Sequence, residues 1–179
     1  LVEPRGSVML NVDDATLPDL VAGEAADTQG AVIIINASES PLTHTSLTVE
    51  MPGAAETTVA VPRVPAMSVR KVPFPIRMSD PGEAETVSVD LTVDDGDGSR
   101  DTAQVSLRVR GPRESRKRTF ISGIDGSVQY YGVQPARPVT DRAPGIVLTL
   151  HGAGVEGIGQ ADAYSSKTWA HIVAPTNRR

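Results

Sequence analysis

Thr86-Val-Ser-Val-Asp-Leu-Thr-Val93 alternates polar and apolar residues along its whole length. In an extended strand the apolar members of this stretch share one face and the polar members share the other. Thr102–Arg110 shows the same alternation a short turn later. Strands of this kind bury one face and leave the other in water, as antiparallel strands do. The pair predicts a protein built from sheets with one buried face.

Five more segments rich in strand-forming residues precede this pair and are separated from one another by turn residues. With them, the strands expected in the first part of the chain are Val8–Val12, Ala31–Ala37, Ser46–Met51, Thr57–Val61, Ser68–Ile76, Thr86–Val93 and Thr102–Arg110. Val32–Ile35 is apolar without alternation, which predicts a central strand covered on both sides. Short strands at this spacing are typical of a two-sheet sandwich. We therefore predict a mainly β fold, with an Ig-like β-sandwich over residues 7–110.

The pattern changes after residue 118. The elements expected from there on are the strands Phe120–Ile124, Ser127–Val133, Gly145–Leu150 and Ala170–Pro175 and a helix near Gln160–Trp169. Asp125-Gly126 supplies the residues of a tight hairpin turn between the first two strands. Gly145–Leu150 is almost wholly apolar, which indicates a strand buried on both faces of a parallel sheet. Because so small a sheet closes no core of its own, we expect residues 119–179 to be the first part of a larger domain.

Charge divides the chain at the same place. Residues 1–110 have 17 acidic and 8 basic side chains, whereas residues 111–179 have 5 acidic and 9 basic ones, and the whole chain has a net charge of −5. Between the two parts, residues 111–118 lack large apolar side chains and are rich in arginine and lysine, which predicts an exposed linker. An acidic first part argues against a nucleic-acid partner, because binding the phosphate backbone requires a basic face.

Composition excludes several other classes of protein. The 179 residues contain no cysteine, which excludes disulfides, thiolate metal sites and a cysteine nucleophile. No apolar run approaches the roughly 18 residues that a membrane-spanning helix needs, and no signal peptide is visible. We expect no cofactor and no metal ion.

The string that could carry chemistry is His151-Gly-Ala-Gly-Val-Glu-Gly157, directly after the apolar strand. One interpretation is an NAD(P)-binding unit, because Gly152, Gly154 and Gly157 fit the pattern G-x-G-x-x-G. Such a unit also has an acidic residue at the end of the next strand. Pro175-Thr-Asn177 has no acid there, and a hairpin precedes the motif. Because of these two departures, NAD(P) binding is the alternative interpretation and not the leading one.

The second interpretation is a loop that stabilises negative charge on a carbonyl oxygen under attack. Glycines suit such a loop, because the backbone itself must approach the substrate. Over Gly145–Gly154 and Ala170–Arg179 the sequence resembles α/β-hydrolases of the prolyl-oligopeptidase and esterase kind. The resemblance covers residues 119–179. It implies a serine hydrolase that transfers the acyl group of a small ester or peptide substrate to water.

The resemblance also assigns roles within the loop. Gly152 and Ala153 would direct their N–H groups at the oxyanion. Gly154 would turn the loop back toward the helix, and His151 would fix the loop without acting as the catalytic histidine. The nucleophile pattern Gly-x-Ser-x-Gly is absent from the 179 residues. Since serine, acid and histidine follow the loop in that order in this family, the resemblance places all three beyond Arg179 and predicts that residues 1–179 alone are inactive.

The sandwich shows a resemblance of its own. Ala31–Ala37, Leu47–Met51 and the proline-bearing stretch Val61–Ile76 resemble Ig-like bacterial modules of the CARDB cell-adhesion class. This implies an alternative function as a non-catalytic binding or adhesion module. The sandwich would either pack on the hydrolase domain or bind an unknown surface ligand. An Ig-like module joined to a hydrolase also suggests a secreted or periplasmic protein.

Other conspicuous residues have ordinary structural explanations. Tyr164 and Trp169 are expected to serve packing rather than substrate contact, and His171 to be a hydrogen-bonded core group. No carboxylate pairs with His44 at the spacing of metal ligands, and Ser165 and Ser166 lack the flanking glycines of a nucleophile turn. Asp94–Asp101 gathers carboxylates that would suit calcium. It lacks the glycine and the glutamate of an EF-hand loop and lies between two alternating strands, which favours a solvated hairpin turn.

Overall fold

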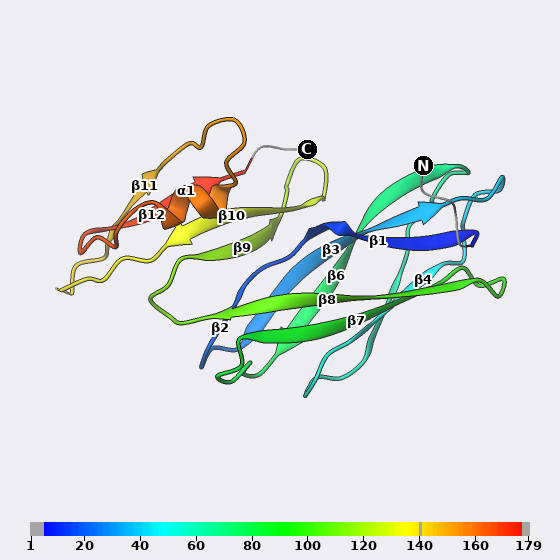
Figure 1. Cartoon of the computed structure of the whole chain (residues 1–179), viewed down its shortest axis with the longest axis horizontal. Helices are drawn as coiled ribbons and strands as arrows, with labels where there is room; N and C mark the ends of the chain where they lie inside the picture. The colour runs from blue at the N-terminus through cyan, green and yellow to red at the C-terminus, as the bar shows by residue number, and fades with distance from the viewer. Residues whose placement is uncertain (1–5, 140, 177–179) are drawn as a thin grey trace.

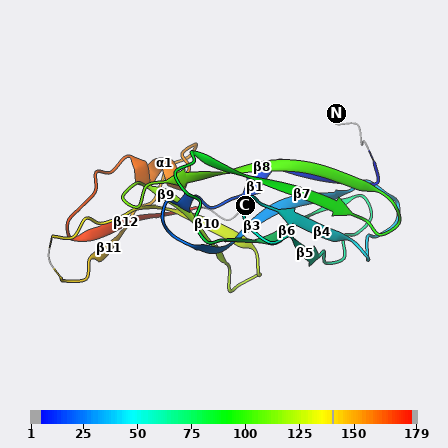
Figure 2. The same cartoon turned by 90° about the horizontal axis from the view of Figure 1, so that it is seen from below.

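The computed structural model describes residues 6–139 and 141–176. Strands make up 51% of it and helix 4%. Figure 1 shows two lobes that lie end to end, a larger one built from the first eight strands and a smaller one built from the last four strands and a helix. Figure 2 shows the same elongated arrangement from below. The expected β-rich architecture with several sheets is confirmed.

The larger lobe consists of two sheets. The smaller sheet contains β1 (Val8–Thr16), β3 (Ala26–Asn36) and β6 (Ser68–Met78), antiparallel and in the order β1-β3-β6. The larger sheet contains, in spatial order, β2 (Leu20–Val21), β8 (Arg100–Arg110), β7 (Thr86–Asp94), β4 (Ser46–Glu50) and β5 (Thr57–Ala60). Its pairs are antiparallel except for β2, which runs parallel to β8. All seven expected strands are present, and β2 is additional.

One apolar core lies between the two sheets. The inward residues of β7 and β8 are those that the alternation predicted, and Leu91 and Leu107 are fully buried. They belong to the same core as Ile34 and Phe74 of the smaller sheet. β3 is central, as predicted, but burial alternates along residues 32–35. The expectation that this strand is covered on both sides is therefore wrong, because the core covers one face of it.

β6 is an edge strand that contains two prolines. Pro73 lies opposite Ala31 and Pro75 opposite Gln29 of β3. Within the described residues no strand pairs with the other edge of β6. Proline has no N–H to donate, and within sheets it is confined largely to edge strands. The free edge of β6 therefore lacks two of the donors that an added strand would need.

The smaller lobe is a sheet of four strands. In spatial order these are β11 (Gly145–Leu148), β12 (Ala170–Pro175), β10 (Val128–Gln134) and β9 (Arg116–Ile121). β11 and β12 run parallel, and the other pairs are antiparallel. The expected hairpin between β9 and β10 is present, and Gly126 in its turn has a φ of +71°. A positive φ of this kind is what the Asp-Gly turn supplies.

The segment expected to be an exposed linker is shorter than predicted. Ser115 and Arg116 are buried, and β9 already begins at Arg116. The Arg116 guanidinium donates through Nη1 to the carbonyl oxygens of Pro112 and Glu114. These bonds satisfy part of the hydrogen-bonding capacity of the buried guanidinium, which explains how a residue of this basic segment can be buried. The prediction of an exposed linker through residue 118 is wrong beyond Glu114.

Helix α1 (Gly157–Asp162) lies against β10 and β12 (Figure 1). It begins earlier and is shorter than the helix expected at Gln160–Trp169. Ser165 and Ser166 follow its end, and serine favours turns over helix interiors because its hydroxyl competes for backbone hydrogen bonds. The helix therefore stops before the residues that were expected to continue it.

Two glycines allow α1 to approach the sheet closely. A Cβ at Gly132 of β10 would lie 2.5 Å from the carbonyl oxygen of Gly157, and a Cβ at Gly157 would lie 2.8 Å from that of Ala174. Both contacts are with backbone, which cannot move aside as a flexible side chain could. Gly157, the third glycine of the G-x-G-x-x-G pattern, therefore has a packing role between helix and sheet.

Gly132→Ala is expected to lower the free energy of unfolding by about 1–3 kcal/mol, because the added methyl group overpacks the contact with α1. Urea denaturation followed by circular dichroism measures this change. Gly123→Ala is the matched control, since a Cβ there meets no atom within 4 Å and the backbone φ is not positive. Equal stability of the two variants would contradict the close approach of α1 to β10.

The sheet of the smaller lobe is covered on one face. α1 lies on the face formed by alternate residues that include Ile172 and Ala174, both buried. On the opposite face the register places Ile146 beside His171 and Leu148 beside Val173. Ile146 is 73% exposed and Leu148 is 65% exposed. The prediction that Gly145–Leu150 is buried on both faces is therefore wrong.

The helix content also corrects the resemblance to α/β-hydrolases. Folds of the α/β class cover a mostly parallel sheet with helices on both faces. Helix accounts for 4% of the residues that the structure describes, and these contain one helix of six residues, on one face of one sheet. The structure therefore contradicts the resemblance on which that family was inferred.

Asp19 joins the two lobes. Its side chain is 1% exposed and accepts hydrogen bonds from Nε and Nη2 of Arg108 at 3.0 and 3.1 Å. The same carboxylate accepts from the backbone N–H of Lys117 in β9 at 2.7 Å, and the Asp19 N–H donates to the Lys117 carbonyl oxygen. A second connection comes from the Thr119 hydroxyl, which donates to the Gln29 carbonyl oxygen at 2.6 Å. The lobes are thus held by hydrogen bonds between β9 and the sandwich.

Candidate functional site

The loop at residues 151–154 follows β11 at one edge of the smaller sheet. Because β11 and β12 are parallel, their carboxyl ends lie at the same edge. The Thr149 N–H continues the pairing by donating to the Val173 carbonyl oxygen at 2.9 Å. α1 begins a few residues after the loop. Ligands of sheets with parallel strands bind outside the carboxyl ends of those strands, which makes this loop the candidate site.

A tight turn shapes the loop. The Val155 N–H donates to the Gly152 carbonyl oxygen at 3.3 Å, which closes a turn over residues 152–155. Gly154, the third residue of this turn, has a φ of +78°, whereas the φ of Ala153 is not positive. This combination is that of a type II turn, which requires a positive φ at its third position. Gly154 is therefore needed for the turn itself.

Three residues of the loop are exposed and have backbone amides without an acceptor among the described residues. Gly152, Ala153 and Gly154 are exposed, and a Cβ at either glycine would meet no atom within 4 Å. Among the hydrogen bonds of residues 6–139 and 141–176, none is donated by the amides of these three residues. The turn leaves these donors available to an acceptor from outside. His151 contributes one local contact, with Nδ1 3.1 Å from the Gly152 carbonyl oxygen.

A polar cluster supports the base of the loop. Gln160 of α1 donates through Nε2 to the Thr149 hydroxyl at 2.9 Å. The Thr149 hydroxyl lies 3.1 Å from the Tyr164 hydroxyl. Gln160 lies in α1, whereas Tyr164 lies two residues beyond the end of the helix at Asp162. Tyr164 was expected to serve packing, so its polar role was missed.

The remaining candidates lie away from the loop. His171 Nδ1 accepts from the Ala136 N–H at 3.1 Å, in keeping with the structural role expected for it. Ser166 accepts from Gln134 and Ser165 from Lys167. Trp169 is 63% exposed, so the expectation that it serves packing is wrong. Asn177 and Arg179 lie outside the described residues.

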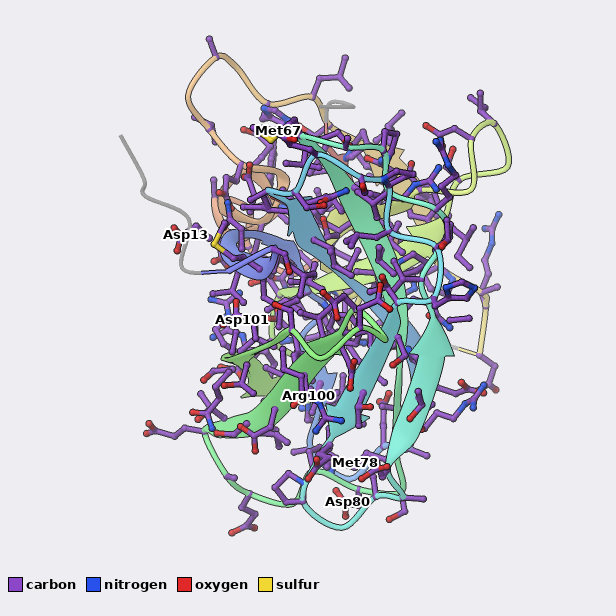
Figure 3. All side chains as sticks on the ribbon, turned by 90° about the vertical axis from the view of Figure 1, so that its right-hand side faces the viewer. Asp13, Met67, Met78, Asp80, Arg100 and Asp101 are labelled. Carbon is purple, nitrogen blue, oxygen red and sulfur yellow. The ribbon has the colours of Figure 1, made fainter. Side chains whose placement is uncertain are left out.

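Asp94–Asp101 forms a hairpin turn between β7 and β8. Asp95 accepts the N–H groups of Asp97 and Ser99, each at 2.9 Å. Asp94 accepts the Gly96 N–H and forms an ion pair with Arg100 at 2.6 Å. Figure 3 views the molecule from the end where Arg100 and Asp101 lie. These carboxylates are occupied by the turn, as the hairpin interpretation predicted. Among the residues that the structure describes, no three acidic or histidine side chains are grouped to hold a metal ion.

Hydrogen bonds within this turn affect the pKa of Asp95. Burial alone would raise the pKa, but the N–H groups of Asp97 and Ser99 and the Ser7 hydroxyl outweigh it, so the pKa is lowered. A carboxyl group with a lowered pKa in the folded state stabilises the fold above its unfolded pKa of about 3.9. That contribution is lost as the pH falls through the folded pKa.

Asp95→Asn is therefore expected to reduce the acid-induced loss of stability below about pH 4. Urea unfolding at pH 7, 5, 4 and 3 measures the dependence. Asp97→Asn changes an exposed carboxylate of the same turn and should leave the wild-type dependence intact. If both variants lose stability in acid as steeply as the wild type, Asp95 does not contribute in this way.

The larger lobe contains a hollow of about 470 Å³. It lies between β6 and the turn that connects β4 to β5. Its lining includes Ala26, Met51, Ala54, Pro75, Arg77 and Met78. Met78 is labelled in Figure 3. Asp27 and Arg77 form an exposed ion pair at 3.2 Å beside it.

Comparisons with known proteins add little to this site. No family model matches the chain, and no curated protein matches it. Among solved structures it is similar to Spo0M, a sporulation control protein from Bacillus subtilis, at 10% identity and a TM-score of 0.32. The match covers 72% of this chain and 66% of that one, slightly less than two thirds. A TM-score this low supports no argument about fold or function.

No family model and no curated protein supports the resemblance of the sandwich to CARDB-type modules. In the part of the chain that the structure describes, no helix has the length and apolar character to cross a membrane.

Proposed function

We propose that the loop at residues 151–154 binds the carbonyl oxygen of an ester or peptide substrate during acyl transfer to water. The observation that supports this is a set of exposed backbone amides that have no acceptor within residues 6–139 and 141–176, at the carboxyl edge of a parallel strand pair. Amide donors held in place before the reaction stabilise the negative charge that develops on such an oxygen. Gly152 and Ala153 are the donors in this proposal, and His151 and Gly154 shape the loop.

The chemistry requires a nucleophile. A serine oxygen forms a bond to the carbonyl carbon, and the electron pair of the C=O bond moves to the oxygen held by the loop. The proton of the serine hydroxyl passes to the leaving group, whose bond to the carbonyl carbon breaks as the C=O bond re-forms, and water then releases the acid and restores the serine. The pattern Gly-x-Ser-x-Gly does not occur in the 179 residues, so the proposal takes the nucleophile from a segment or chain outside them.

The test is covalent labelling. The reading frame that encodes residues 1–179 is expressed at its full length and treated with a fluorophosphonate probe, and the labelled residue is mapped by mass spectrometry. The proposal expects one labelled serine and loss of p-nitrophenyl acetate hydrolysis when that serine becomes alanine. Residues 1–179 alone serve as the unlabelled control. Absence of a labelled serine would refute the proposal.

The hollow in the sandwich favours a second candidate, a non-catalytic binding module. Met51 and Met78 give this hollow an adaptable apolar lining, and the Asp27–Arg77 ion pair offers charge beside it. A polysaccharide and peptide array probed with residues 1–179 would test this candidate. Binding that is lost in Met78→Glu would favour it, and binding unaffected by that change would count against it. A secreted or periplasmic location stays a prediction, which cell fractionation would test.

A further inference from the structure

Loop 151–154 is anchored at both ends by contacts that the catalytic proposal does not use. At one end, Thr149 pairs through its N–H with β12 and through its hydroxyl with Gln160. At the other end, Gly157 lies directly on the sheet, where a Cβ would come within 2.8 Å of the Ala174 carbonyl oxygen. Between these anchors the loop has the turn bond from the Val155 N–H to the Gly152 carbonyl oxygen and the local contact of His151 Nδ1 with the same oxygen.

The three side chains Thr149, Gln160 and Tyr164, here called the hydroxyl cluster, link strand and helix across the base of the loop. Gln160 donates through Nε2 to the Thr149 hydroxyl at 2.9 Å and to the Tyr164 hydroxyl at 3.4 Å. The two hydroxyls are 3.1 Å apart. Each member thus contacts both others, and the cluster connects Thr149, just after β11, to Gln160 of α1 and to Tyr164, two residues beyond the end of α1.

We infer that the hydroxyl cluster positions the amides of loop 151–154 for the carbonyl oxygen of the substrate. This inference rests on the proposed function, and it makes Thr149, Gln160 and Tyr164 positioning residues that do not contact the reacting atoms. A displacement of about 1 Å of groups around a reacting centre can lower a rate by about 100-fold. The cluster adds a side-chain link between Thr149, just after β11, and α1, whose first residue is also held on the sheet by the close contact of Gly157.

Thr149→Val tests the inference with the smallest change in shape, because it replaces the hydroxyl with a methyl group and keeps the β-branched side chain. Thr149→Ser is the matched variant, since it keeps the hydroxyl. The first measurement is the 15N order parameter of the Gly152, Ala153 and Gly154 amides in residues 1–179. We expect a fall from about 0.85 to below about 0.6 in Thr149→Val and wild-type values in Thr149→Ser.

The second measurement is hydrolysis by the protein that carries the nucleophile. The inference expects a fall in kcat of about 10- to 100-fold in Thr149→Val with KM unchanged, and recovery in Thr149→Ser. Tyr164→Phe, which removes one hydroxyl and keeps the ring, should show a smaller fall in the same direction. An unchanged order parameter in Thr149→Val, or a disordered loop with unchanged kcat, would overturn the inference. If the loop amides become disordered in Thr149→Val but the wild-type protein has no hydrolytic activity, the proposed function is refuted. The structural role of the cluster is then still supported.

Discussion

Ala153→Pro is expected to lower kcat of the hydrolytically active protein by about 100- to 1,000-fold, with little change in KM. The substitution removes one backbone N–H, and the loss of a single oxyanion donor has an effect of this size. Proline is favoured at the second position of a type II turn, which is the position of Ala153 in the turn closed by Val155 and Gly152. The loop should therefore keep its shape while it loses a donor.

Ala153→Ser is the control for this prediction, because it changes the side chain and keeps the N–H. Steady-state kinetics with p-nitrophenyl acetate compare the two variants with the wild type. Circular dichroism confirms that both are folded. A kcat for Ala153→Pro within threefold of that for Ala153→Ser would mean that this amide does not stabilise the transition state.

Asp19→Ala is expected to lower the free energy of unfolding by about 2–4 kcal/mol. The change leaves the Arg108 guanidinium without its carboxylate and the Lys117 N–H without its acceptor. Breaking a fully buried ion pair on one side costs about 3–5 kcal/mol. Arg108 is 46% exposed and water compensates part of the loss, so a smaller value is expected here.

The matched variant is Asp19→Asn, which keeps an oxygen acceptor for the Lys117 N–H and removes the charge. Its loss should be about half that of Asp19→Ala. Urea denaturation at pH 7 gives both values, and limited proteolysis near residues 111–114 reports whether the lobes separate. A change below about 0.5 kcal/mol in Asp19→Ala would show that the junction does not depend on this carboxylate.

The strands of the sandwich and their inward side chains were predictable wherever a strand has one buried face and one solvent-exposed face. Alternation at residues 86–93 and 102–110 identifies the inward side chains correctly, because burial on one face selects every second residue. β2 was missed because two residues, Leu20 and Val21, carry no periodic pattern. Arg116 was misplaced for a different reason. Its burial depends on carbonyl oxygens of Pro112 and Glu114, and no periodicity in side chains reports where backbone oxygens will lie.

The smaller lobe shows where an apolar pattern misleads. Gly145–Leu150 predicts a strand buried on both faces, yet Ile146 and Leu148 are exposed. The apolar segment indicates which side chains are more stable when buried. It does not indicate whether another element of the chain packs against both of its faces. The position of the loop after the strand was predictable from the glycines at 152 and 154. The hydroxyl cluster was not, because Thr149 meets Gln160 and Tyr164 only when α1 folds back over the strand.

Pro73 and Pro75 determine how copies of the sandwich behave when many are crowded together. A neighbouring chain that aligned with the free edge of β6 would meet two prolines, each of which has a backbone carbonyl acceptor and no N–H donor. A continuous intermolecular ladder cannot grow past them. Of the edge strands that the structure describes in the sandwich, β6 is the longest, and these two rings reduce the number of hydrogen bonds that an added strand could form with it.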